Sequence, residues 1–200
     1  MHSFERIIGD IYRLKIPFDN IYTSVFLIEN GKESMLVDSG ASARDVNEYL
    51  IPALSELGIS LDGISTLVLT HAHRDHAGGV ARILEGNPNV SVITEATQIS
   101  DSISTYPLPG HSDDSLGVFD RRTHTLISGD GIQGAGVDKY RTIIQNSKAY
   151  LETLDRIKRD TSVENLLFSH AYEPWYRDSV FGRTAVIKCI DVCYKYIKEL

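Results

Sequence analysis

The 200-residue chain is predicted to have an α/β fold, because short segments with strand character alternate along it with segments of helical character. The strand segments are rich in β-branched and aromatic residues and are bounded by turn residues. The helical segments carry apolar residues three or four positions apart. Without long repeats, low-complexity tracts or linker-like runs, a chain of this length is expected to form a single domain over residues 1–200.

Strands are predicted to open the chain. They are IYRLKI (11–16), YTSVFLIE (22–29) and SMLVD (34–38), and the Asn30-Gly31 pair predicts a hairpin turn between the last two. A helix should follow, since Ser42 and Asp45 resemble a capping box and Gly58 is a typical helix end. Between them, apolar residues recur at helical spacing, as Val46, Leu50, Leu54 and Leu57. Pro52 lies inside this helix, where a proline can produce a kink.

The remaining segments continue the alternation. The predicted strands are ISTLVLT (64–70), VSVITE (90–95) and NLLFSH (165–170). A hairpin that turns at Arg121-Arg122 is predicted from LGVFD (116–120) and HTLISGD (124–130). A short helix is expected over AGGVARILEGN (77–87), a second from a cap at Asn146 to about Arg159, and a third from Arg183 to the end.

Composition and charge restrict the function classes. The net charge of −7 argues mildly against nucleic acid as the main partner, and no apolar stretch reaches the length of a membrane span. The N-terminus carries charged residues where a secretion signal would need apolar ones. Cys189 and Cys193 lie four residues apart and are interpreted as reduced core residues. We therefore expect a cytoplasmic protein that acts on a small molecule, with its oligomeric state left open.

Residues 69–79, LTHAHRDHAGG, crowd three of the seven histidines and one aspartate directly after an apolar run. At the end of a strand, residues two apart point the same way, so His71 and His73 can converge on one point. Asp75 and His76 follow where a helix should begin, and can face a second point nearby. Imidazole nitrogens and a carboxylate without cysteine suit zinc, and are also possible ligands of iron or manganese. The alternating spacing of these histidines, directly after an apolar run, disfavours the alternative interpretation as a histidine-rich surface loop.

This stretch resembles the HxHxDH signature of the metallo-β-lactamase-fold hydrolases. Four further segments are similar to the remaining motifs of that family and occur in the same order: LVDSG (36–40), PLPGHS (107–112), LISGD (126–130) and LLFSH (166–170). Together the five segments cover positions 36 to 170. The resemblance implies an αβ/βα four-layer sandwich, in which two sheets pack between outer helices and the metal ions lie at one edge.

The same resemblance implies a ligand set for two divalent metal ions, zinc in the first place and iron or manganese as alternatives. One ion would be held by His71, His73 and His111, the other by Asp75, His76 and His170, and Asp130 would bridge them. Asp38 is expected to hydrogen-bond near a ligand rather than to serve only as a turn residue. Three aromatic residues near the ligand segments are candidates for the substrate wall: Tyr140, Tyr172 and Trp175.

The activity that the resemblance implies is hydrolysis of a small ester, thioester or lactone by a hydroxide bridging the metals, with the leaving group protonated through water or Asp75. The subfamily stays open; glutathione thioesterases, for example, usually have a histidine at the position of Ala72. Alternatives are an iron-dependent oxidoreductase similar to the persulfide dioxygenases, a phosphodiesterase, and a metal-stabilised binding protein without turnover. The oxidoreductase would use a single iron, so retention of Asp75, His76 and His170 favours the hydrolase.

Overall fold

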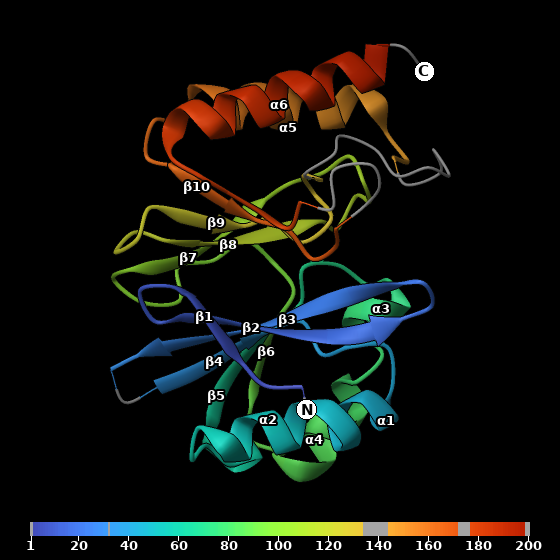
Figure 1. Cartoon of the computed structure of the whole chain (residues 1–200), viewed down its shortest axis with the longest axis vertical. Coiled ribbons are helices and arrows are strands. Elements are labelled where there is room, and N and C mark those ends of the chain that lie inside the picture. The colour runs from blue at the N-terminus through green and yellow to red at the C-terminus, as the bar shows by residue number, and fades with distance from the viewer. Residues whose placement is uncertain (1, 32, 134–143, 172–176, 199–200) are drawn as a thin grey trace. The chain divides into compact units, whose positions relative to one another are not determined.

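The computed structural model describes residues 2–31, 33–133, 144–171 and 177–198 (Figure 1). By its internal contacts the chain divides into two compact units, Met1–Thr94 and Glu95–Leu200. Each unit contains one β-sheet with helices packed on it, so the predicted α/β class is confirmed. The assignment of the whole chain to a single domain stays a prediction.

The first unit is built on a six-stranded sheet in the order β1-β2-β3-β4-β5-β6. Its strands are β1 (Glu5–Ile8), β2 (Ile11–Phe18), β3 (Ile21–Asn30), β4 (Glu33–Val37), β5 (Ile64–Val68) and β6 (Ser91–Ile93). Neighbours from β1 to β4 are antiparallel, whereas β4, β5 and β6 run parallel. The predicted hairpin turn is confirmed: Asn30 ends β3, and Gly31 has a φ of +71°, which glycine adopts without strain.

The first unit also contains several short helical segments. They are α1 (Ala43–Asp45), a π-helical turn (Val46–Leu50) and α2 (Ile51–Glu56) in one continuous segment, then a 3-10 turn (Leu61–Gly63), α3 (Arg74–Ala77) and α4 (Val80–Gly86). Ser42 caps the first segment as predicted, since its hydroxyl accepts from the Asp45 N–H at 3.3 Å. Pro52 has no N–H to donate to the preceding turn, and that turn, Val46–Leu50, is π-helical; the kink at Pro52 stays a prediction. In Figure 1, α1, α2 and α4 lie along the same face, where Leu50, Leu54 and Ile83 join the apolar core.

The second unit is built on a five-stranded sheet in the order β11-β10-β9-β8-β7. Its strands are β7 (Ile103–Pro107), β8 (Leu116–Asp120), β9 (Thr125–Ile127), β10 (Asn165–Leu167) and β11 (Ser179–Phe181). The predicted hairpin is formed by β8 and β9, and β9 pairs with β10 in parallel. The helices α5 (Ser147–Arg159) and α6 (Arg183–Lys198) lie side by side over one face (Figure 1), where Leu154, Ile157 and Ile190 enter the core of this unit.

Five predicted strands end earlier than expected, at Val37, Val68, Ile93, Ile127 and Leu167. The polar residues that end ISTLVLT, VSVITE and NLLFSH leave the sheets as loops instead. The sequence pattern also misses β1, β7 and β11. The strands β1 and β11 are short and partly exposed, and β7 mixes serine, threonine and proline with apolar residues, so none shows a clear strand pattern.

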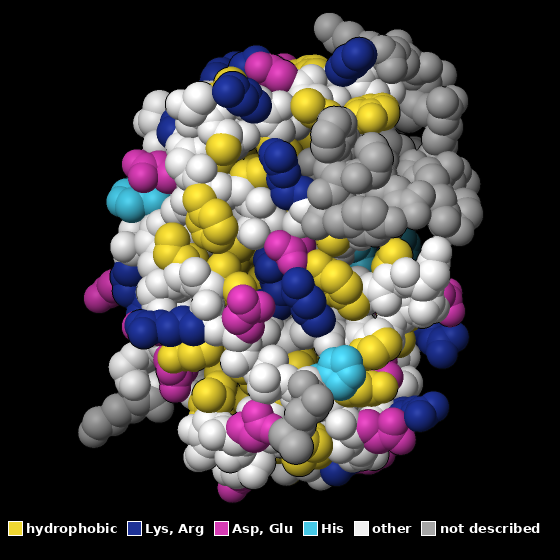
Figure 2. Space-filling view, viewed as in Figure 1, with side chains coloured by type: hydrophobic (Ala, Val, Ile, Leu, Met, Phe, Trp, Pro, Cys, Tyr) yellow, Lys and Arg dark blue, Asp and Glu magenta, His cyan; other side chains and the backbone are white. Residues whose placement is uncertain are grey.

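The helix α6 carries both cysteines. Cys189 and Cys193 are buried in the core of the second unit and remain thiols, in agreement with the interpretation from the sequence. Neither α6 nor any other helix in the described part of the chain is long and apolar enough to cross a membrane. On the face shown in Figure 2, acidic and basic side chains are interspersed over each unit. The expectation that nucleic acid is not a partner stays a prediction.

Asn146 is the N-cap of α5, and its side-chain oxygen accepts a hydrogen bond from the Ala149 N–H at 3.1 Å. Asn146→Ala should lower the free energy of unfolding by about 1 kcal/mol, because this N–H then loses its acceptor. Asn146→Asp keeps an acceptor and should stay within about 0.5 kcal/mol of the wild type. Chemical denaturation of the three proteins checks this, and equal losses in both variants would show that the cap oxygen contributes nothing.

Candidate metal centre

The first set of candidate ligands lies at the ends of two parallel strands. In the β4–β5 pair Val37 lies opposite Val68, so the residues that follow both strands leave the sheet at the same edge. Asp38 directly follows β4, and Thr70 and His71 come shortly after β5. The backbone N–H of Asp38 donates to the Val68 carbonyl at 2.8 Å, which holds the two strand ends side by side.

The helix α3 brings the rest of this set to the same edge. His73 precedes α3 in an extended conformation, and its carbonyl accepts from the His76 N–H at 3.0 Å. The ring centroid of His71 lies 4.5 Å from that of His73 and 4.1 Å from that of His76. The Nε2 atom of His76 lies 3.3 Å from Oδ2 of Asp75. These four residues therefore form one cluster, in which His71 and His76 are buried.

The two glycines after this cluster allow α3 to pack closely. A Cβ atom on Gly78 would collide with the Ala41 carbonyl, and one on Gly79 would collide with the Ser39 carbonyl. Instead, the Gly79 N–H donates to Ser39 Oγ at 3.1 Å, and the Ser39 N–H donates to the His76 carbonyl at 2.8 Å. Two residues without side chains thus let His76 lie against the turn that follows β4.

A buried carboxylate, Asp38, organises the first set. Its Oδ1 accepts from the Thr70 N–H at 2.8 Å, and its Oδ2 accepts from the Thr70 hydroxyl at 2.9 Å. The same Oδ2 lies 2.7 Å from Nδ1 of His76. Because a carboxylate only accepts, the proton of His76 is on Nδ1 and the lone pair is on Nε2. Asp38 has a φ of +67°, a strained value outside glycine, which these hydrogen bonds stabilise.

Thr70 extends this orientation to a second imidazole. Its Oγ1 lies 3.2 Å from Nδ1 of His71 and 3.3 Å from Nδ1 of His76. Since the Thr70 hydroxyl gives its proton to Asp38, its oxygen accepts from the Nδ1–H of His71. The Nε2 lone pair of His71 is then available as a ligand, as it is for His76. One carboxylate and one hydroxyl therefore set the tautomer of two candidate ligands.

The second set of candidate ligands follows a parallel strand pair of the second unit. In the β9–β10 pair Ile127 lies opposite Leu167, so the chain leaves both strands at the same edge. Asp130 and His170 each lie three residues beyond the end of their strand. As a result, Oδ1 of Asp130 lies 3.3 Å from Nε2 of His170.

His111 comes from the loop between β7 and β8. Its Nε2 lies 3.7 Å from Oδ2 of Asp130, so the two oxygens of this carboxylate face two different imidazoles. The preceding Gly110 has a φ of +138°, and a Cβ atom there would lie 2.5 Å from the Cα of Tyr150. The Gly110 carbonyl accepts from the Asn146 N–H at 3.0 Å. His111 is thus held at the start of α5 by a position that suits only glycine.

The chemistry of the two sets fits divalent metal ions. An imidazole lone pair and a carboxylate oxygen repel each other unless a proton or a cation lies between them. His76 carries its proton on Nδ1, so the contact of its Nε2 with Asp75 fits a cation, and Asp130 faces its two imidazoles in a similar way. These histidine and aspartate groups could hold a metal ion. Nitrogen and oxygen donors without cysteine suit zinc, and are possible for iron or manganese.

The sequence-predicted ligands thus fall into two sets, one in each unit. The first contains His71, His73, Asp75 and His76, and the second contains His111, Asp130 and His170. Their roles as ligands stay predictions. The hydrogen bond expected of Asp38 near a ligand is present, to His76. The three candidates for the substrate wall, Tyr140, Tyr172 and Trp175, lie outside the described residues.

Two threonines of the site are missing from the sequence prediction. Thr70 directly precedes His71, and a polar residue at the end of a buried strand was the signal that could have identified it. Thr23, in β3, donates its hydroxyl to Oδ2 of Asp75 at 3.2 Å across 52 positions of chain. No local pattern marks Thr23, because its partner is distant in sequence.

Comparisons with known sequences identify a family that part of the chain resembles. Residues 19–99 match the family described as Metallo-beta-lactamase superfamily. The chain is 27% identical over 164 residues to the Beta-lactamase-like protein 2 homolog of Caenorhabditis elegans, covering 71% of this chain and 54% of that protein. It is 26% identical over 151 residues to the Atrochrysone carboxyl ACP thioesterase of Emericella nidulans, covering 68% and 47%. The chain therefore spans about half the length of these curated relatives.

Solved structures share the fold. The metallo-β-lactamase FIM-1 from Pseudomonas aeruginosa, in its mono-zinc form, aligns with a TM-score of 0.75 over 98% of this chain and 96% of that one, at 18% identity. A metallo-β-lactamase from Erythrobacter litoralis aligns with a TM-score of 0.70 over 96% of each chain, also at 18% identity. At this identity the likeness shows the fold alone, and it confirms the fold that the resemblance implied.

Thr70 allows a test of the hydrogen-bond network around the first set. Thr70→Val keeps the shape but removes the hydroxyl, so zinc affinity should fall about 10- to 100-fold, as for other groups that orient metal ligands. Thr70→Ser keeps the hydroxyl and should retain affinity within about threefold of the wild type. Competition with a chromophoric chelator measures both variants. Equal losses in the two would mean that packing, rather than the hydroxyl, is what matters at this position.

Proposed function

We propose that the chain, which matches the metallo-β-lactamase superfamily over residues 19–99, is a hydrolase of that superfamily and uses the ligands of both units to hold two divalent metal ions. One ion is bound by His71, His73 and His111, the other by Asp75, His76 and His170, and Asp130 bridges them. The observation that carries this proposal is the placement of Asp130, whose two oxygens face two different imidazole nitrogens. Zinc is the metal that we expect first, with iron or manganese as alternatives.

When bound, two divalent ions lower the pKa of a water molecule to about 7 and polarise the bond to be cleaved. The residues of the chain determine the charge and orientation around them. Asp75 and Asp130 contribute two negative charges and the ligating histidines are neutral, so positive charge remains to stabilise a developing oxyanion. Asp38 and Thr70 keep His71 and His76 in the tautomer that presents Nε2.

Asp75 is the residue that we assign to proton transfer. Its Oδ2 accepts from the Thr23 hydroxyl at 3.2 Å and lies 3.3 Å from Nε2 of His76. Its side chain is 14% exposed, whereas that of His76 is fully buried, so the carboxylate retains an accessible side. From this position it can take up a proton from the attacking water and deliver it to the leaving group.

The bond proposed is that of a small ester, thioester or lactone, and a thioester is preferred. The thioesterase name of the Emericella nidulans relative supports this choice. A thiol has a pKa near 8.5, far below that of an alcohol, so a thiolate leaves with less need of protonation. The cytoplasmic location expected from the sequence is part of this proposal.

Metal dependence is the first test of this proposal. Short-chain acyl thioesters are supplied to the zinc-loaded protein, and release of the free thiol is followed. Dialysis against a chelator should lower turnover at least about 100-fold, and added zinc should restore it, because the nucleophile depends on the metals. Elemental analysis of the active protein should find about two zinc ions per chain. One iron per chain would favour the oxidoreductase, and turnover that survives chelation would contradict metal-dependent hydrolysis.

Substitutions should separate ligand histidines from surface histidines. His71→Ala and Asp130→Asn should each reduce kcat/KM by about 100-fold or more, because each removes a group that holds metal. The matched control is His124→Asn, since His124 is exposed and asparagine tolerates its φ of +54°. This control should keep wild-type activity. Equal activity in all three variants would remove Asp130 and His71 from the site.

A further inference from the structure

The turn that carries Asp130 is hydrogen-bonded to the core of the second unit at both of its ends. At its first end, the Ser128 N–H donates to the Leu167 carbonyl at 2.9 Å. At its second end, the Gln133 carbonyl accepts from Sγ of Cys193 at 3.3 Å. Asp130 lies between these two hydrogen bonds, so both of them constrain the position of its carboxylate.

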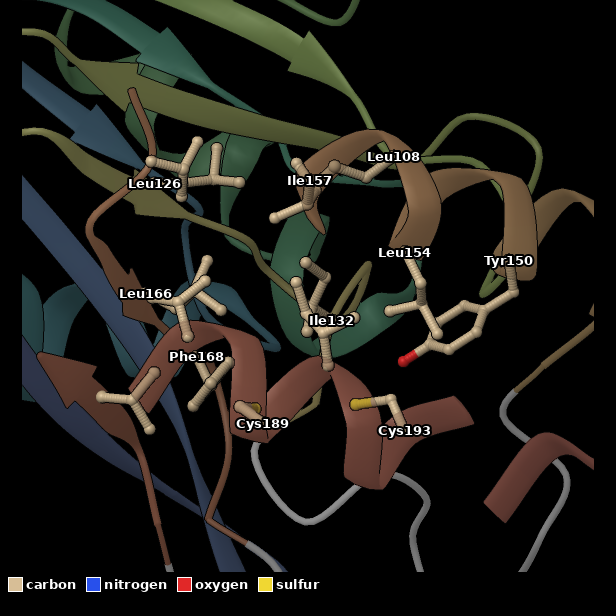
Figure 3. Close-up of a cluster of buried hydrophobic side chains, with 14 of the residues drawn as sticks. Leu108, Leu126, Ile132, Tyr150, Leu154, Ile157, Leu166, Phe168, Cys189 and Cys193 are labelled. Atoms are coloured by element: carbon tan, nitrogen blue, oxygen red, sulfur yellow. The ribbon is translucent and has the colours of Figure 1, made fainter. Parts of the chain in front are cut away.

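The donor of the second hydrogen bond is a thiol from α6, 60 positions further along the chain. Cys193 is fully buried, and Figure 3 shows its sulfur and the Tyr150 hydroxyl in the same part of the buried cluster as Ile132. The neighbouring Cys189 thiol, together with burial, raises the pKa of the Cys193 thiol well above its ordinary value. At neutral pH Cys193 therefore keeps its proton and can donate it to the Gln133 carbonyl.

The interior of the turn leaves little room for adjustment. The Ser128 hydroxyl donates to the Ile132 carbonyl at 3.0 Å, and the Gly131 N–H donates to the Ser128 carbonyl at 2.9 Å. A Cβ atom on Gly131 would lie 2.6 Å from Cβ of Leu108. Ile132 belongs to the same apolar core as Cys193. A shift of the backbone at the Gln133 end of the turn therefore also moves Asp130, because the interior of the turn cannot adjust to it.

We propose that Cys193 is a positioning residue for Asp130, and that metal binding and the chemical reactivity of this thiol are linked. The inference rests on the proposed function, in which Asp130 bridges the metals. Metal bound to Asp130 stabilises the turn in its folded position, so the local unfolding that exposes Cys193 becomes rarer. Modification of Cys193 releases the turn and weakens metal binding. By thermodynamic linkage, the factor by which metal disfavours the open turn equals the factor by which opening the turn weakens metal binding.

The first experiment needs no metal. Cys193→Ala and Cys193→Ser leave side chains of similar size and differ by a hydroxyl that can donate to Gln133. Hydrogen exchange of the amides of residues 129–133 is compared in the metal-free proteins. Exchange should be about 3- to 10-fold faster in Cys193→Ala, the effect of one net hydrogen bond, and within about twofold of the wild type in Cys193→Ser. Cys189→Ala removes the neighbouring thiol one helical turn away but keeps the Cys193 thiol that donates to Gln133, so it should not accelerate this exchange.

The second experiment measures the linkage. N-ethylmaleimide forms a bond between its ring carbon and the sulfur, and the thiol proton ends on the adjacent ring carbon. Labelling of each cysteine is followed by mass spectrometry, with and without saturating zinc. Zinc should slow the labelling of Cys193 at least about tenfold more than that of Cys189, because Cys193 bonds to the turn that carries the ligand. The zinc dissociation constant should rise in Cys193→Ala and not in Cys189→Ala.

The outcomes separate this inference from the proposed function. Unchanged exchange in Cys193→Ala, or equal acceleration in Cys189→Ala, would overturn the positioning role even in a protein that binds zinc. Equal protection of both thiols would overturn the linkage. A protein that takes up no zinc contradicts the proposed function, while the exchange measured without metal still decides whether Cys193 holds the turn.

Discussion

Parallel strand pairing is the constraint on which the candidate site depends. In the first unit the site residues follow β4 and β5, and in the second they follow β9 and β10. Parallel neighbours end at the same sheet edge, so Asp38 meets His76 and Asp130 meets His170 although each pair is about 40 positions apart in sequence. Reversing one strand of either pair would carry its polar residue to the opposite edge.

The polar clusters are stabilised by hydrogen bonds and by the apolar cores beside them. A buried carboxylate is strongly unfavourable unless hydrogen-bonded groups replace its water. Asp38 meets this need through Thr70 and His76, and these bonds also offset its strained φ of +67°. On the helix-covered faces of the two sheets, the apolar clusters under α2 and α4 and under α5 and α6 supply stability that does not depend on metal. The loops with the candidate ligands can therefore hold closely spaced polar groups, because the apolar clusters supply the stability of the fold.

Sequence reasoning succeeded where the signal is local. The cap at Asn146, the hairpin turn at Gly31 and the crowded motif from His71 to His76 each lie within a few residues, and the structure bears out the first two as predicted. Periodicity alone reached only the α/β class, and the fold family came from the resemblance of five short motifs. The bonds from Thr23 to Asp75 and from Cys193 to Gln133 span 52 and 60 positions. A single sequence contains no sign of such pairs, because each partner is an ordinary residue until the chain is folded.

Anomalous diffraction at the zinc edge, from crystals grown with zinc, tests the central claim most directly. We expect two peaks roughly 3.5–4 Å apart, the separation typical of two-metal sites. One should be contacted by His71, His73 and His111, the other by Asp75, His76 and His170, with Asp130 reaching both. A single peak, or two peaks that Asp130 does not contact, would contradict the binuclear centre.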